Sequence, residues 1–144
     1  MNLGRYNDAN KDLTLTDNYL VGATEFPNPW QTMTISGNTF IGPVTGAIDT
    51  SQYPGNVYLA DKPTGTKVFV RANREQAGRA HVIVYNWDGA DQVEVDLAAV
   101  LKSGDGFEVR NGQSFLAPAA AKGTFEGAPV SLPGPWPHGK SFAV

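Results

Sequence analysis

Two stretches decide the fold: Leu13-Thr-Leu-Thr-Asp-Asn-Tyr-Leu-Val-Gly22 and Met33-Thr-Ile-Ser-Gly-Asn-Thr-Phe-Ile-Gly42. The second repeats the pattern of the first at an offset of twenty residues. In each copy two apolar residues alternate with Thr or Ser, an Asn follows, and an apolar run ends in Gly. Such alternation predicts a short strand with one buried face. Asn tolerates the left-handed backbone conformation of a sharp corner. The repeat therefore predicts a strand, a corner, a second strand and a glycine turn in each copy.

In-register stacking of the two copies predicts a short right-handed parallel β-helix in residues 1–45, with Asn18 directly over Asn38 in an asparagine ladder. The alternative is two unrelated hairpins that share the same turn residues. Solenoid repeats are stabilised by their neighbours, and roughly three or more are usually needed. Two coils would therefore leave one end open, and either upstream coils or a second copy of the chain would have to cover it.

Beyond the repeat the pattern changes twice. Residues 46–66 are rich in Gly and Pro with little periodicity, which indicates a connector. Residues 67–144 predict an antiparallel β-sandwich of jelly-roll or immunoglobulin-like type, because short apolar runs are separated by turn residues. Asp88-Gly-Ala-Asp91 predicts a hairpin turn between two of these strands. The seven predicted strands are 67–71, 80–87, 92–97, 106–110, 124–126, 129–132 and 141–144.

The composition is typical of an all-β fold and excludes several classes of protein. The chain has 144 residues, of which 16 are Gly and 10 are Pro, and it has no Cys. Its net charge of −3 argues against the pervasive basic surface that nucleic acid requires. The sequence contains no apolar run of about 18 residues, which a membrane-spanning helix would need. It also contains no Cys pair and no His-Glu-x-x-His motif, which would indicate a metal site. We therefore expect no nucleic-acid partner, membrane span, metal or cofactor.

Four segments in the second half resemble, in their order, the carboxy-terminal β-sandwich of bacterial right-handed parallel β-helix repeat proteins. The segments are Val84-Tyr-Asn-Trp87, Val95-Asp-Leu97, Phe107-Glu-Val-Arg-Asn111 and Gly123-Thr-Phe-Glu-Gly-Ala-Pro-Val-Ser-Leu-Pro133. In that group the sandwich follows the last coils of a much longer solenoid, and better-known relatives cleave or bind polysaccharides. The resemblance covers nearly the whole chain and implies an extracellular or cell-envelope location. Most of the solenoid, where polysaccharide-processing relatives usually carry their catalytic groups, is absent from this sequence.

Candidate catalytic residues are few. Glycoside hydrolysis needs two carboxylates across a cleft, and Asp17, Glu25 and Asp49 are the candidates because they lie in or near the predicted coils. His138 lies in the loop Trp136-Pro-His-Gly139 and is a candidate base, whereas His81, in a predicted central strand, is expected to be structural.

Candidate ligand-binding residues are aromatic or basic. Trp30 and Trp136 lie in Pro-flanked loops, where a flat ring can stack on a sugar, although covering the coil end is an alternative role. Arg71, Arg74 and Arg79 belong to one predicted hairpin loop, and guanidinium groups bind the carboxylates of acidic polysaccharides. Internal pairing with the acidic stretch 85–108 is the alternative for these arginines. The charges of Glu108 and Arg110 are explained by a solvated sheet face.

Three functions remain open at this stage. The favoured one is a non-catalytic carbohydrate-associated or structural module that caps a β-helix surface protein. The second is an enzyme, a hydrolase or lyase, that acts on polysaccharide through surface carboxylates. The third is an assembly module that associates through the open coil end. The expected partners are accordingly a polysaccharide, upstream coils or further copies of the chain.

Overall fold

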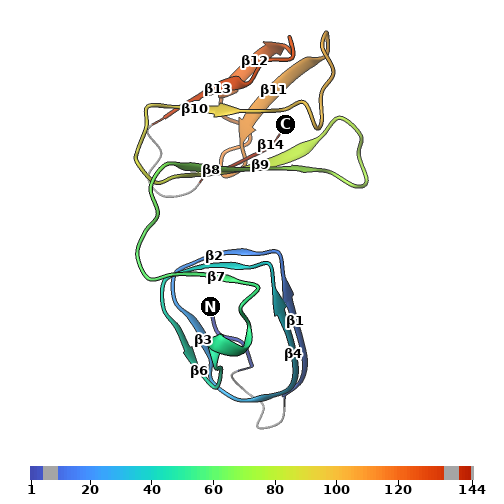
Figure 1. Cartoon of the computed structure of the whole chain (residues 1–144). Coiled ribbons are helices and arrows are strands. Elements are labelled where there is room, and N and C mark those ends of the chain that lie inside the picture. Colours follow the sequence, from blue (N-terminus) through green and yellow to red (C-terminus); the bar gives the residue numbers. More distant parts are fainter. Residues whose placement is uncertain (5–9, 135–139, 144) are drawn as a thin grey trace. The chain divides into compact units, whose positions relative to one another are not determined.

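Figure 1 shows the computed structural model, which describes residues 1–4, 10–134 and 140–143. Over these residues the chain is all-β, with several small sheets, and its one helical element is a single 3-10 turn, η1 (Thr50–Gln52). Two compact units divide the chain, an N-terminal unit (Met1–Pro63) and a C-terminal unit (Thr64–Val144). In the described part, no helix has the length and apolar character needed to cross a bilayer.

The N-terminal unit contains two coils of three strands each, and every strand of the first coil pairs in parallel with its counterpart in the second. The paired residues are twenty apart, for example Leu15 with Ile35 and Leu20 with Phe40. These pairs confirm the internal repeat found in the sequence. The strands of the first coil are β1 (Asn10–Thr16), β2 (Tyr19–Val21) and β3 (Thr24–Phe26), and those of the second are β4 (Trp30–Ser36), β5 (Thr39–Ile41) and β6 (Val44–Gly46).

The stacking continues into the range predicted as a connector. Strand β7 (Val57–Leu59) pairs in parallel with β5, so one side of a third coil is present. Between β6 and β7 the chain forms η1, and the Ser51 N–H of this turn donates to the side chain of Asp49. The first unit accordingly extends to Pro63 instead of ending near residue 45.

An asparagine stands at the same corner of each coil and joins it to the next. The Asn18 amide Nδ2 lies 2.9 Å from Asn38 Oδ1, and the Asn38 Nδ2 lies 2.9 Å from Asn56 Oδ1. Asn38 is 1% exposed, and its own Nδ2 also donates to the backbone carbonyls of Leu15 and Ser36. A buried amide needs its donors and acceptors satisfied, so this ladder fixes the register of the corners. The predicted position of Asn18 over Asn38 is confirmed.

In the first two coils, the residue before the ladder asparagine makes the sharp bend of the corner. Asp17 has φ 55 and Gly37 has φ 67, both in the left-handed region. An Asp in this region is uncommon but is among the residues that tolerate it. The backbone N–H of Asp17 donates to Ser36 across the coils, and that of Gly37 donates to Gly55.

The interior of the coils is a narrow apolar core. Phe26, Ile35 and Phe40 are buried at its centre. The Phe40 and Tyr58 rings stack with centroids 5.2 Å apart and planes at 4°. Burial raises the pKa of the Tyr58 phenol, and its hydroxyl donates to the Tyr53 carbonyl at 3.3 Å. Like side chains thus pile up along the stack, as in-register parallel pairing requires.

The C-terminal unit is built from two antiparallel sheets. The larger sheet has the order β12-β11-β14-β9-β8, and the smaller one pairs β10 with β13. The last strand of the chain, β14, therefore lies in the middle of the larger sheet. The strands are β8 (Thr66–Ala72), β9 (Ala80–Asn86), β10 (Gln92–Val95), β11 (Gly106–Asn111), β12 (Ala121–Thr124), β13 (Val130–Pro133) and β14 (Lys140–Ala143).

One apolar core joins these two sheets. Val82 and Val84 from β9 pack in the same buried cluster as Val93 and Val95 from β10. Val109 from β11 and Leu132 from β13 complete it, with Leu97, Leu101 and Phe125 from the connections. In β10 and β11 the buried valines alternate with exposed Glu94 and Glu108, as the period of a strand requires.

Two expectations for the C-terminal unit are wrong. Residues 88–91 do not close a hairpin, because β9 and β10 belong to different sheets. The chain crosses between the sheets there, and the Asn86 side chain holds the crossing through both backbone groups of Ala90. The strand expected at 124–126 lies earlier, as β12, and Phe125 instead anchors the chain in the core just beyond that strand.

Candidate functional site

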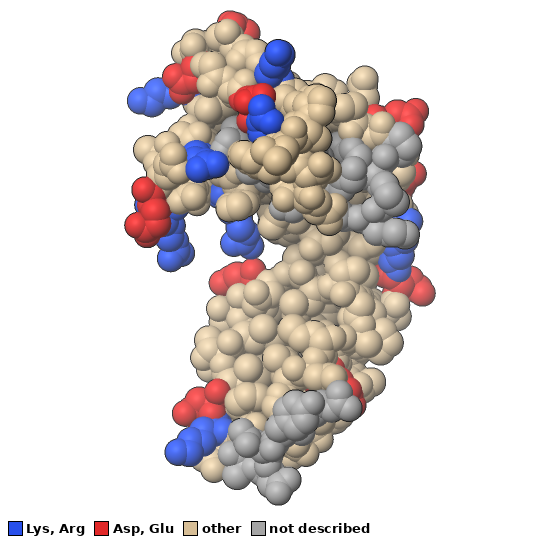
Figure 2. Space-filling view, turned by 180° about the vertical axis from the view of Figure 1, so that it is seen from behind, with Lys and Arg blue, Asp and Glu red and all other residues tan. Residues whose placement is uncertain are grey.

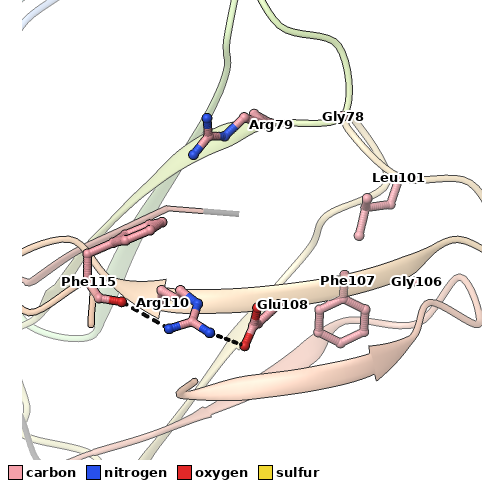
Figure 3. A pocket seen from close by; sticks show the side chains of 8 residues that line it. All are labelled: Gly78, Arg79, Leu101, Gly106, Phe107, Glu108, Arg110 and Phe115. Atoms are coloured by element: carbon pink, nitrogen blue, oxygen red, sulfur yellow. Dashed lines mark hydrogen bonds and ion pairs between the residues drawn. The ribbon is translucent and has the colours of Figure 1, made fainter. Parts of the chain in front are cut away.

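A cavity of about 250 Å³ on the C-terminal unit brings basic, acidic and aromatic side chains together (Figure 3). Its walls come from the end of the β8–β9 loop, from β11 and from the loop after β11. Arg79 faces it from one side, and Arg110 and Glu108 project from β11 on the other. Leu101, Phe107 and Phe115 supply its apolar surface, and Gly78 and Gly106 complete the lining. We call this cavity the arginine pocket.

Hydrogen bonds, an ion pair and an aromatic contact hold the Arg110 side chain in place. Its Nη2 donates to Glu108 Oε1 at 2.7 Å, which is the only ion pair among the described residues. Its Nη1 donates to the carbonyls of Phe115 and Ala117 at 3.0 and 3.1 Å. The guanidinium also lies 5.6 Å from the centre of the Phe115 ring. A guanidinium with its rotamer fixed in this way is preorganised to meet a ligand.

Arg79 enters the pocket from a loop that is ordered by its own hydrogen bonds. The Asn73 side chain accepts from the N–H groups of Glu75 and Gln76, and the Asn73 N–H donates to the Arg79 carbonyl. Arg79 Nη1 donates to Gln76 Oε1 at 2.8 Å. Arg79 has no carboxylate partner among the described residues, so its charge is available to a ligand.

A row of residues across the larger sheet leads from Arg71 to the pocket. Arg71 on β8 lies opposite His81 on β9, His81 opposite Ala143 on β14, and Ala143 opposite Arg110 on β11. Directly opposed residues share one face of a sheet, so Arg71, His81 and Arg110 lie on the outer face. A smaller hollow of about 220 Å³ beside the row is lined by Asn73, Arg79, Ala80 and His81.

The charge around the arginine pocket is local. The C-terminal unit has eight basic and eight acidic residues, and the N-terminal unit has three basic and six acidic residues. In Figure 2 most of the visible charged side chains lie over the C-terminal unit, with both signs interspersed. Arg71, Arg79 and Arg110 therefore concentrate positive charge on a unit that is neutral as a whole, with Glu108 as the one acid that lines the pocket.

This arrangement can bind an anion but does not assemble the two-carboxylate chemistry of glycosidases. Arg79 presents a guanidinium group suited to a carboxylate, whereas Arg110 already donates twice from Nη1 and once from Nη2 and adds only its remaining N–H hydrogens. The Phe115 ring is 47% exposed, and an apolar sugar face can pack on such a ring. Glu108 is the single carboxylate in the lining, and it is engaged by Arg110. Hydrolysis at this pocket would need a second carboxylate.

The three predicted catalytic carboxylates occupy separate places, and no hydrogen bond joins them. Asp17 makes the corner before Asn18, and Glu25 is exposed in the middle of β3. Asp49 caps η1, and hydrogen bonds from the Ser51 side chain and backbone, and from Gln52, hold the pKa of its carboxyl below the ordinary value. The structure thus accounts for Asp17 and Asp49 through local turns.

The predicted aromatic and histidine sites have mixed outcomes. Trp30 begins β4, packs against the coil core, and has an indole N–H without a hydrogen-bond partner among the described residues. Trp136 and His138 lie outside the described residues. Of the three arginines, Arg79 lines the pocket, Arg71 lies on the row that leads to it, and Arg74 is exposed in the loop.

A second aromatic surface lies on the same outer sheet face. Tyr85 and Trp87 stack with centroids 5.6 Å apart, and Phe69 meets Tyr85 edge-on at 6.4 Å. Lys67 Nζ and the Arg71 guanidinium lie 5.4 and 5.8 Å from the centre of the Phe69 ring. Sequence reasoning placed β9 only as a central strand and so missed this cluster of rings.

Sequence reasoning also missed Glu108, Arg110 and Phe115 as pocket residues. The spacing of Glu108 and Arg110 placed them on one strand face, which the structure confirms, but such charges are common on solvated sheets. The available signal was the adjacent Phe115-Leu116 pair among the turn residues after Asn111, since neighbouring apolar side chains on a surface loop can mark an interaction site. Leu116, beside Phe115, is 97% exposed.

Comparisons with known proteins do not place the chain in a family. No family model, no curated protein and no solved structure matches it. Among the described residues, no group of three or more His, Cys, Asp or Glu side chains is arranged to hold a metal ion. The arginine pocket and the stacked coils are therefore the features of this chain that bear on its function.

Proposed function

We propose that the chain is a non-catalytic, carbohydrate-associated module in which a short parallel β-helix precedes an antiparallel β-sandwich, and that the arginine pocket binds acidic sugars. The observation that carries the proposal is the convergence of Arg79 and Arg110 on one cavity beside the exposed Phe115 ring. The in-register coils and the core shared by two sheets support the architecture.

An acidic sugar fits this pocket better than a neutral one. A uronic acid carries a carboxylate for a guanidinium fork and an apolar ring face for an aromatic side chain. Arg79 has no acidic partner among the described residues, so binding a carboxylate there does not require an existing ion pair to break. Arg110 already has Glu108, and it contributes a fixed donor direction more than free charge.

Calorimetric titration with an oligogalacturonate, a linear uronic-acid oligosaccharide, and with a neutral glucan oligosaccharide of the same length tests the proposal. We expect saturable binding of the acidic oligosaccharide alone, weakening as salt is raised. Arg79→Ala should reduce the affinity about tenfold or more, because a charge-assisted hydrogen-bond pair is lost. Arg74→Ala is the matched control, since Arg74 belongs to the same loop but does not line the pocket.

Equal binding of the neutral and the acidic oligosaccharide would contradict the proposed ligand class. An equal loss in Arg74→Ala and Arg79→Ala would show that loop charge alone, and not the pocket, is responsible. Release of new reducing ends during the incubation would replace the binding module with an enzyme acting on polysaccharide.

A further inference from the structure

The two ends of the stack of coils differ in what packs against them. At the downstream end, Ile48 and Tyr53 pack against the coil core, and Asn56 Nδ2 donates to the Ile35 carbonyl of β4. The segment between β6 and β7, which contains η1, therefore covers part of that end, and in Figure 1 both η1 and the N-terminus lie within the outline of the coils. At the upstream end, β1 and β2 are edge strands of their sheets over the described residues.

Burial of the interior side chains records the same asymmetry. Leu15 and Ile35 occupy one position in successive coils, and Leu15 is half-buried whereas Ile35 is buried. Leu20 is likewise half-buried, whereas Phe40, its partner in the second coil, is 1% exposed. An apolar interior position that is covered on one side only exposes the other side to water.

The hydrogen bonds of the asparagine ladder all run in one direction, from each coil to the next. The acceptor at the upstream end of the ladder is Asn18 Oδ1. The Asn18 N–H and Nδ2 donate to Asn38 Oδ1 at 3.0 and 2.9 Å. The Asn38 N–H and Nδ2 donate to Asn56 Oδ1 at the same two distances. Each Oδ1 thus receives two bonds from the preceding coil. Among the described residues, nothing donates to Asn18 Oδ1.

Asn38 and Asn56 each also donate a second hydrogen bond, from Nδ2 to a backbone carbonyl of the preceding coil. Asn38 Nδ2 donates to the carbonyl of Leu15, which is three residues before Asn18. Asn56 Nδ2 donates to Ile35, which is three residues before Asn38. Within the described part of the chain, Asn18 Nδ2 reaches only Thr16 in its own coil and Asn38 in the next. By the same rule Asn18 would donate to a carbonyl three residues before an asparagine in a preceding coil.

One side of such a preceding coil is already present. Asn2 pairs in parallel with Glu25 on β3, just as Glu25 pairs with Thr45 on β6. The Leu3 N–H donates to the Glu25 carbonyl at 2.9 Å, and the Glu25 N–H donates to Met1 at 2.8 Å. The stack therefore extends one step further at β3 than at β1 and β2.

We infer that the free edges of β1 and β2, together with Asn18, form a docking surface for one further parallel coil. That coil supplies two strands in the pattern of apolar residues alternating with Thr or Ser, followed by an asparagine. Its asparagine donates from N–H and Nδ2 to Asn18 Oδ1, and it covers the half-exposed Leu15 and Leu20. This inference does not rest on sugar binding by the arginine pocket.

The chain carries the material for a direct test. A copy of residues 27–43, which contains β4, β5 and the corner asparagine, is fused in front of Met1 of the full chain. Residues 1–3 then follow the copy as residues 44–46 follow the original, because Asn2 and Thr45 both pair with Glu25. We expect amide hydrogen exchange in β1 and β2 to slow about tenfold or more, and the melting temperature of the N-terminal unit to rise.

The control is the same fusion with Ala in place of the copied Asn38, and a second variant adds Asn18→Ala to the original fusion. Both should lose most of the added protection. Equal protection in the fusion and its Ala control, or no protection in either, would overturn the inference. Concentration-dependent self-association of the unmodified chain that protects β1 and β2 would also overturn it, because the occupant would then be a second copy. Sugar binding is measured separately, so neither result depends on the other.

Discussion

The two units of this chain differ in how their strands find partners. In the N-terminal unit each strand pairs with the strand one coil later, and identical or similar residues meet, such as Thr14 with Thr34. In the C-terminal unit β8–β9 and β11–β12 pair as neighbours in the chain, but the other partners are remote in sequence, as when β10 pairs with β13 and β9 with β14. A period specifies the first kind of pairing locally, whereas the second needs the whole unit to be present.

Deleting residues 140–144 should have the largest effect and would sharpen this comparison most. Strand β14 lies between β11 and β9, so its loss leaves the larger sheet in two parts. We expect the C-terminal unit to lose its cooperative thermal transition while the N-terminal unit keeps its own, as seen by calorimetry and by hydrogen exchange. A cooperative transition retained by the shortened C-terminal unit would show that the central position of β14 is not essential.

Asn38→Asp should be the most damaging point substitution in the coils. The buried carboxylate cannot donate to Leu15 and Ser36, and it would face the Asn56 Oδ1 acceptor. We expect a loss of about 3–5 kcal/mol in the free energy of unfolding of the N-terminal unit, measured by denaturant titration. Asn18→Asp is the matched control at the half-buried end and should cost less. Equal losses at the two positions would contradict the asymmetry of the ladder.

Leu132→Ala tests the core that the two sheets of the C-terminal unit share. Leu132 is 1% exposed, and its truncation leaves a cavity between β9 and β13 side chains. We expect a loss of about 3 kcal/mol, confined to the unfolding transition of this unit. Leu116→Ala, at the exposed loop tip, is the control and should change stability by less than about 0.5 kcal/mol. A similar loss in both variants would count against the shared core.

Gly37→Ala should have a smaller effect, because it challenges one corner only. The φ of 67 at this position disfavours any side chain, and an added Cβ would also clash with Asp17 Oδ1, so the cost is about 1–2 kcal/mol or more. Gly55→Ala is the control, since Gly55 lacks a positive φ and its added Cβ would meet only Ser36 at 3.9 Å. Denaturant titration of both variants measures the difference, and an equal effect would argue against backbone strain as the cause.

The smallest expected effect is the titration of Asp49. Hydrogen bonds from Ser51 lower the pKa of this carboxyl, so the charged form is favoured in the folded state. Its contribution to stability is present above the unfolded pKa and is lost as pH falls through the folded pKa. Carbon-detected NMR titration should give a midpoint below the ordinary Asp value. Ser51→Ala should move the midpoint upward, and an unchanged midpoint in that variant would contradict the assigned cause.

The comparison also explains how much of the fold the sequence could predict. The coils were predictable because Asn18 and Asn38 recur with their flanking apolar residues at a constant offset. The third coil was not, because η1 interrupts the repeat and Asn56 follows Asn38 by 18 residues. The parallel pairing of β7 with β5 and the hydrogen bonds from Asn38 to Asn56 show it in the structure.

In the C-terminal unit, the strands were predictable but their partners were not. Alternation located β10 and β11, since it depends on one strand and one buried face. The crossing at residues 88–91 has the composition of a hairpin turn, and nothing local distinguishes it from one. The decisive interaction is the pairing of β10 with β13, which depends on residues far along the chain.

The candidate site was predictable only where charge was concentrated. Three arginines in one loop pointed to Arg79, which does line the pocket. Arg110 and Glu108 have an ordinary spacing for a solvated strand, and the loop that brings Phe115 back to Arg110 is set by hydrogen bonds to two carbonyls. The local sequence does not show that this loop folds back onto Arg110.

The shared positions of successive coils have a consequence for how this chain tolerates insertions and deletions. Duplicating or removing a block of twenty residues leaves every remaining coil with neighbours of the same kind. Inserting a single residue into β4 would instead turn its interior side chains outward from that point on. The N-terminal unit can therefore change length in whole blocks, whereas the C-terminal unit, completed by its final strand, has no such module to gain or lose.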